Sequence, residues 1–241
     1  MRATTASNPT YRLADHVRAC RVGDQIVMLD LKNSRYIGLG GRMLSAWFPG
    51  IDAGSMKIGN PSSLLASESS EQVARLVSQG LLVNAPETIH ARAALGEPLY
   101  SLNAEDEPGR AGLEWRHVFS VWVSAAIAAG WLRHRSLADI ADRVACSRRG
   151  TPTSGDEVTE PLREAVAAYV RARPFGLTAH DRCLHDSLTL IRFLAARRLF
   201  PQWAIGVRTH PFSAHSWVQC GSVVLNDTHE NVRRYQPLLV V

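Results

Sequence analysis

The residues in this chain best suited to chemistry are Cys183, His215 and Asp227, which follow one another in that order. A thiol, an imidazole and a carboxylate are the parts of a nucleophilic acyl-transfer site. The imidazole takes the proton of the thiol, and the carboxylate orients the imidazole and stabilises its cation. We therefore predict a triad with Cys183 as nucleophile, His215 as base and Asp227 as orienting acid.

Other interpretations of these residues remain open. A single cysteine on a helix is often a small buried apolar residue, and an aspartate at the end of a strand often forms a turn. The three residues could also bind a metal, but no second Cys or His lies at ligand spacing from them. The remaining cysteines, Cys20, Cys146 and Cys220, form no CxxC pair, so neither a zinc ribbon nor a thiol redox motif is predicted.

The nucleophile requires an element that favours its thiolate form. The pattern predicts a helix from Asp181 to Leu199, with Asp181 as its N-cap. Cys183 would then lie at the helix N-terminus, where unpaired backbone N–H groups lower the pKa of a thiol. The backbone N–H of Cys183 would supply part of an oxyanion hole.

The base and the acid fall on two predicted strands joined by a hairpin. Because side chains alternate along a strand, the length of the hairpin loop decides which residue faces His215. A three-residue loop, 220–222, would place Asp227 opposite His215. A two-residue loop, 220–221, would place Asn226 there instead. We predict the odd-length loop.

The rest of the pattern predicts an α+β protein with two modules. Residues 1–84 would form a small module with a three-stranded sheet and helices, and residues 85–112, rich in Pro and Gly, a linker. Residues 113–241 would form a larger module with helices first and a small antiparallel sheet last. The predicted strands are 16–20, 25–30, 34–39, 81–83, 203–208, 214–219 and 223–227. The predicted helices are 43–48, 61–66, 70–80, 114–132, 137–145, 161–172 and 181–199.

The composition is that of a globular protein: of 241 residues, 46% are hydrophobic and 20% charged, with a net charge of +5. No dense basic run with interleaved aromatic residues occurs, so nucleic-acid binding is not expected. The N-terminus lacks the apolar segment of a signal peptide, and no apolar stretch is long enough to span a bilayer. With scattered cysteines, these features predict a reduced, cytoplasmic protein without a membrane partner.

Several motifs together resemble the lasso peptide biosynthesis B protein family, which carries a transglutaminase/papain-like cysteine peptidase domain. They are CLHDSLTL at 183–190, IGVR at 205–208, PFSAHSWV at 211–218 and Asn226-Asp227. The resemblance covers residues 113–235 and implies the same three catalytic roles for Cys183, His215 and Asp227. Ser216 and Gln219 depart from the family, where an Ala and an acid are commoner.

The first module resembles the PqqD-like RiPP recognition element, a small winged-helix-like domain. The resemblance rests on VMLDL at 27–31 and RYIGL at 35–39. It implies that the leader of a precursor peptide binds as an added strand on the third strand and against the last helix. The docking residues would be Ser34, Arg35, Tyr36, Ile37, Gly38, Leu39, Val73, Leu76 and Val77. Packing in the core is the alternative role for the apolar members.

The resemblance implies a leader peptidase that binds a lasso precursor and cleaves its leader from the core peptide. The partner would be a separate asparagine synthetase-like cyclase that uses ATP. This chain has no G-x-x-x-x-G-K-[ST] loop, so no cofactor is expected and ATP would act through the cyclase. Two alternatives are a transglutaminase-type acyl transferase and a non-catalytic leader-binding scaffold.

Overall fold

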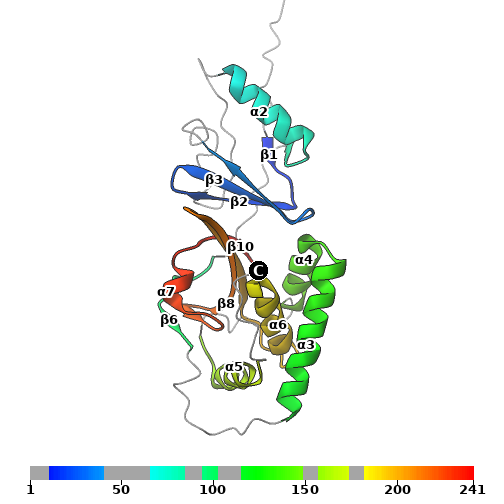
Figure 1. The fold of residues 1–241 in the computed structure, drawn as a ribbon, viewed down its shortest axis with the longest axis vertical. Coiled ribbons are helices and arrows are strands. Elements are labelled where there is room, and N and C mark those ends of the chain that lie inside the picture. The colour runs from blue at the N-terminus through cyan, green and yellow to red at the C-terminus, as the bar shows by residue number, and fades with distance from the viewer. Residues whose placement is uncertain (1–10, 41–65, 85–93, 103–114, 149–156, 174–181) are drawn as a thin grey trace, which may run out of the picture. The chain divides into compact units, whose positions relative to one another are not determined.

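The computed structural model describes residues 11–40, 66–84, 94–102, 115–148, 157–173 and 182–241 (Figure 1). The chain divides into two compact units, Met1–Arg92 and Ala93–Val241. The boundary between them falls inside the predicted linker, 85–112. The protein is mixed α+β, as predicted, and each unit is described below by itself.

The described part of the N-terminal unit contains two small antiparallel sheets and helix α2 (Ala66–Ser78). A three-stranded sheet has the order β2-β3-β4, with β4 at one edge. A two-stranded sheet pairs β1 with β5. The three predicted strands of this module are confirmed, with small shifts at their ends. The bounds are Tyr11–Leu13 for β1, Val17–Val22 for β2, Gln25–Asp30 for β3, Arg35–Leu39 for β4 and Leu82–Asn84 for β5.

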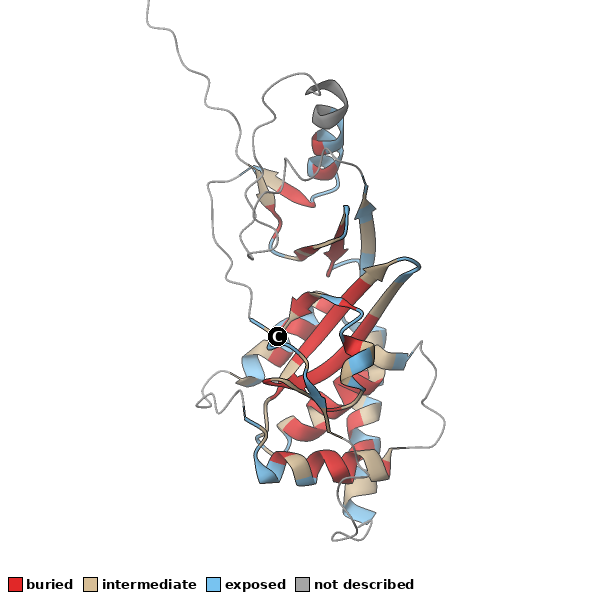
Figure 2. Ribbon diagram, turned by 90° about the vertical axis from the view of Figure 1, so that its left-hand side faces the viewer, coloured by how far each residue is buried: buried red, intermediate tan, exposed pale blue. Residues whose placement is uncertain are grey.

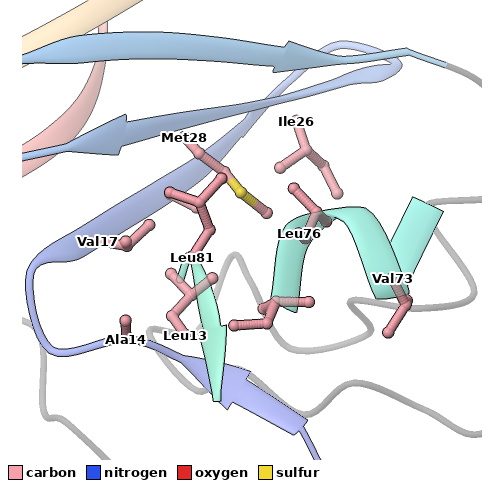
Figure 3. Packing of buried hydrophobic residues seen from close by; sticks show 10 residues of the cluster. Leu13, Ala14, Val17, Ile26, Met28, Val73, Leu76 and Leu81 are labelled. Carbon is pink, nitrogen blue, oxygen red and sulfur yellow. The ribbon is translucent and has the colours of Figure 1, made fainter. Parts of the chain in front are cut away.

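The core of this unit lies between the sheets and α2, where Val73 and Leu76 pack against residues of β2 and β3 (Figure 3). The predicted C-cap of the helix is confirmed. Gly80 adopts a φ of 70°, which favours glycine, and the N–H of Leu81 donates to the carbonyl of Leu76 at 2.9 Å. The predicted helices 43–48 and 61–66 lie outside the described residues, except Ala66, the first residue of α2.

The C-terminal unit combines helices with a five-stranded sheet of order β10-β7-β8-β9-β6. Neighbouring strands are antiparallel, except that β6 runs parallel to β9. The middle of the sheet is buried (Figure 2). The helices are α3 (Trp115–His134), α4 (Leu137–Arg148), α5 (Glu160–Ala172), α6 (Cys183–Ala195) and α7 (His229–Val232). The strands are β6 (Tyr100–Ser101), β7 (Gln202–Thr209), β8 (Phe212–Cys220), β9 (Val223–Val224) and β10 (Gln236–Val240).

Part of the predicted linker belongs to the sheet of the C-terminal unit. Strand β6 extends the edge of that sheet, and Leu95 packs on a buried cluster that includes Trp217. Gly96 makes this approach possible, because a Cβ there would lie 2.6 Å from the carbonyl oxygen of Gly221. The sequence pattern did not predict β6, β10 or α7, since short elements of this kind depend on contacts with distant residues.

Among the described residues, no helix combines the length and apolar character needed to cross a membrane.

Candidate active site

Cys183 is the first residue of helix α6 and is partly exposed. Its backbone N–H therefore has no partner within the helix, as the predicted oxyanion role requires. Arg182 precedes the helix and makes no side-chain capping bond, while the predicted cap, Asp181, lies outside the described residues. The helix ends at Ala195, before the predicted Leu199, because the chain turns at Arg198, whose φ is 60°.

The structure brings His215 close to both other members of the predicted triad. Its Nε2 lies 2.5 Å from Oδ2 of Asp227. Its ring also lies near Cys183, which contributes to its raised pKa. Cys183 on α6, His215 on β8 and Asp227 in the segment after β9 thus lie together.

These contacts make His215 a strong base. Burial favours the neutral ring, but the hydrogen bond to Asp227 and the negative charges of Asp227 and Cys183 outweigh it and raise the pKa of His215 to about 9. The imidazole ring also lies beside two aromatic rings, 6.1 Å from Trp217 and 5.0 Å from Tyr235 between centroids. Aromatic faces stabilise a nearby cation, so this setting suits an imidazolium.

The hairpin that carries His215 differs from the prediction. Strand β8 pairs with β9 at Cys220–Val223 and Gln219–Val224, so the turn holds only Gly221 and Ser222. The predicted odd-length loop is therefore wrong, and the rejected alternative, a turn of 220–221, does not occur either. Strand β9 ends at Val224, so strand register does not decide which residue faces His215.

The side chain of Asn226, two residues after the end of β9, redirects the main chain. The Oδ1 atom of Asn226 accepts a hydrogen bond from the backbone N–H of Val218 at 2.8 Å, where a ladder would use a backbone carbonyl. Its Nδ2 atom donates to Asp186 at 3.0 Å and to Ser187 at 3.2 Å. With Asn226 held in this way, the main chain leaves the sheet, and Asp227 comes next to His215.

Asp227 is then fixed by groups that follow it in the chain. The amide of Asn231 donates to its Oδ2 at 2.9 Å, and the backbone N–H of Thr228 donates to its Oδ1 at 2.7 Å. Burial would raise the pKa of this carboxyl, but the hydrogen bonds from His215, Asn231 and Thr228 outweigh it and lower the pKa. At neutral pH Asp227 is therefore an anion beside the His215 cation.

Asp186 is not among the residues that the sequence pattern predicted for the site. It lies one helical turn after Cys183 and is only 4% exposed. It accepts hydrogen bonds from Tyr169 at 2.8 Å and from Asn226, and it pairs with Arg173 at 3.1 Å. Burial and the Asp186 carboxylate raise the pKa of Tyr169, which keeps the phenol a donor. The only sequence feature that pointed to this cluster was the spacing of Tyr169 and Arg173, which lie four residues apart at the end of a predicted helix.

Ser187, the residue after Asp186, connects helix α6, which carries Cys183, to strand β8, which carries His215. The hydroxyl of Ser187 donates to the carbonyl of Ser216 at 2.8 Å, next to His215. The two departures from the family pattern also have partners. Ser216 Oγ accepts from the indole of Trp203 at 2.8 Å, and Gln219 accepts from Trp217 at 3.0 Å.

The predicted leader-docking residues fall into two groups. Ser34 precedes β4 and the strand itself holds Arg35 to Leu39, at the edge of the three-stranded sheet. Val73 and Leu76 are buried in the core of the unit, so packing is the role that the structure favours for them. Val77 is 37% exposed.

No group of three or more His, Cys, Asp or Glu side chains in the described part of the chain is arranged to hold a metal ion. The arrangement at Cys183 has instead the parts of a nucleophilic site. It pairs a partly exposed thiol at a helix N-terminus with a base that is itself hydrogen-bonded to a carboxylate.

The C-terminal unit matches a known superfamily. Residues 121–240 match the family model described as the transglutaminase-like superfamily. That superfamily includes cysteine peptidases and acyltransferases.

One curated relative matches a shorter stretch. Over 45 residues the chain is 49% identical to the Microcin J25-processing protein McjB of Escherichia coli. The match covers 19% of this chain and 22% of that protein. No solved structure matches the chain.

Proposed function

We propose that this protein is a cysteine peptidase that removes the leader from a lasso precursor peptide. The observation that carries the proposal is the grouping of Cys183, His215 and Asp227, with His215 hydrogen-bonded to Asp227, in the part of the chain that matches the transglutaminase-like superfamily. The 45-residue similarity to a Microcin J25-processing protein supports a precursor peptide as the substrate. The family resemblance of the motifs supports the same substrate, with a separate ATP-using cyclase acting on the freed core peptide.

In the first half of the proposed reaction, His215 holds the proton of Cys183. The thiolate attacks the carbonyl carbon of the peptide bond between leader and core, and the oxyanion that forms is met by the backbone N–H of Cys183. The C–N bond then breaks as His215 gives its proton to the leaving amine of the core peptide. The leader remains bound to Cys183 as a thioester.

In the second half, His215 takes a proton from water, and the hydroxide attacks the thioester. The C–S bond breaks, the leader leaves with a new carboxyl group, and the Cys183–His215 pair is restored. Asp227 holds the ring in place and stabilises its cation in both halves. No cofactor takes part in these steps.

The proposed role of the N-terminal unit is to bind the leader as an additional strand on β4. Strand β4 pairs with β3 on one side and forms an edge of its sheet. An edge strand offers backbone groups to an extended peptide, and side chains such as the exposed Val77 could select the sequence. Binding there would raise the local concentration of the scissile bond at the catalytic domain.

The proposal is tested by incubating the full chain and its Cys183→Ala variant with a precursor peptide and recording product masses. The wild-type protein should release a leader that has gained one water, and the variant should release none. Cys146→Ala, a change at an exposed cysteine on α4, is the matched control and should retain full activity. Cleavage by Cys183→Ala would refute the peptidase assignment, and a leader joined to an amine would show acyl transfer instead of hydrolysis.

A further inference from the structure

Helix α3 carries an apolar seam on its exposed side. Trp115, Phe119 and Trp122 are 79%, 63% and 57% exposed, which is unusual for three large aromatic side chains on one helix face. The seam continues through exposed positions at the same alternating spacing of four and three residues. Its full set, called here the α3 seam, is Trp115, Phe119, Trp122, Ala126, Ala129 and Arg133.

The opposite side of α3 is buried within the C-terminal unit. Its buried residues, Val121, Ser124 and Ala128, face the body of the C-terminal unit, where α3 packs against α6 and α5. In Figure 1, α3 lies at the edge of this unit with α6 on its inner side. A spacing that alternates between three and four residues is the pattern by which one helix packs along another. The α3 seam therefore has the form of a helix-packing surface.

The side chains of the α3 seam are large at Trp115, Phe119 and Trp122 and small at Ala126 and Ala129. This change in size along the helix identifies the partner. We propose that the α3 seam docks antiparallel on the α3 seam of a second copy of this chain. When two such helices run in opposite directions about a centre at residue 124, Trp122 meets Ala126 of the other copy, and Phe119 meets its Ala129. The rings of Trp122 and Phe119 are thus placed against the smallest side chains of the opposing seam, in both halves of the interface.

The charges of the helix agree with this direction of packing. Helix α3 contains no Asp or Glu. In the antiparallel arrangement Arg133 of one copy meets Trp115 of the other, and a guanidinium stacks favourably on an indole face. A parallel arrangement would instead place the two Arg133 side chains together and the rings against one another.

Other occupants fit the seam less well. A bilayer surface would bury the aromatic rings whatever the order of large and small side chains, so it gives no role to the gradient. Packing against a second copy requires that order, because each subunit contributes both the large and the small side chains of the interface. The six aromatic rings of the pair would bury on the order of 800 Å². That is below the size of a stable interface, so the dimer should be weak, with a Kd on the order of tens of micromolar.

The test is sedimentation velocity of the full chain over a wide concentration range, with two variants. Ala126→Trp puts an indole where the partner's Trp122 must lie and should weaken dimerisation at least tenfold. The double variant Trp122→Ala/Ala126→Trp exchanges the large and small positions, restores complementarity and should regain the affinity of the wild-type chain. The far-UV circular dichroism spectrum of each variant shows that the fold is kept.

A cross-linking experiment tests the geometry independently. Val123 is 41% exposed, and in the proposed dimer the two copies of Val123 flank the symmetry axis. Val123→Cys in a Cys146→Ala background should form a disulfide-linked dimer on mild oxidation. The wild-type chain, whose exposed Cys146 lies on α4, is the control for random collisions and should cross-link far less.

Three results would overturn the proposal. The first is a wild-type chain that stays monomeric up to about 1 mM, well above the expected Kd. The second is a dimer whose affinity does not change in Ala126→Trp or is not restored by the exchange. The third is binding of the wild-type monomer to anionic lipid vesicles that Ala126→Trp strengthens, which would identify the seam as a membrane surface.

Discussion

Replacing Asp227 with Asn should lower the pKa of His215 and slow bond cleavage. The pKa of His215 is about 9, against an ordinary value of 6.5. A difference of that size corresponds to about 3 kcal/mol in favour of the imidazolium. Asp227 contributes to it through a hydrogen bond and through its charge, and Cys183 contributes the rest. Asn keeps the shape of the side chain but removes its charge, so the pKa should fall by at least about one unit.

The effect is measured by the pH dependence of kcat/KM and by NMR titration of the His215 ring. In the wild-type protein the alkaline limb should lie near pH 9, where His215 loses the proton it must give to the leaving amine. In Asp227→Asn that limb should move toward neutral pH, and kcat at pH 7 should fall by roughly 100- to 10,000-fold. Asp142→Asn, the same chemical change at an exposed site on α4, is the matched control and should alter neither quantity.

The same pKa shift predicts a pH dependence of stability. A group whose pKa is raised on folding stabilises the folded state fully below its unfolded pKa, and this contribution is lost as the pH rises through its folded value. For His215 the loss should fall between about pH 6.5 and pH 9 and should shrink in Asp227→Asn. An unchanged alkaline limb together with an unchanged loss of stability in Asp227→Asn would refute the role assigned to Asp227.

Three further changes test other parts of the structure. Asn226→Ala leaves the N–H of Val218 without its acceptor and should destabilise the protein by about 2 kcal/mol in urea unfolding, with at least a tenfold lower kcat. Gly206→Ala places a Cβ 2.8 Å from the ring of Trp217, which lies beside His215, and should cost about 1–3 kcal/mol in the same assay. Val77→Asp should raise KM for the precursor about tenfold with little change in kcat, because it weakens leader binding alone. An unaltered KM in that variant, or an equal effect of the control Gln72→Asp on the same helix, would count against docking beside α2.

Local patterns were enough to predict most of the elements. The helices α3 to α6 and the strands β7 and β8 lie where apolar periodicity placed them, because each has a long amphipathic or buried run. Gly80 ended its helix as predicted, since a residue with positive φ is a local property. The short elements β6, α7 and β10 escaped prediction because their partners are distant in sequence.

The sequence by itself determined which residue types could form a nucleophilic site and on which elements they stand. The tertiary structure decided how they meet. The predicted strand register was wrong, and Asp227 reaches His215 because Asn226 takes up the N–H of Val218 and bends the chain out of the sheet. The tertiary structure also made Asp186 a buried partner of Asn226, Tyr169 and Arg173. Side-chain hydrogen bonds between distant elements leave no periodic trace in a sequence, so this part of the site required the folded chain.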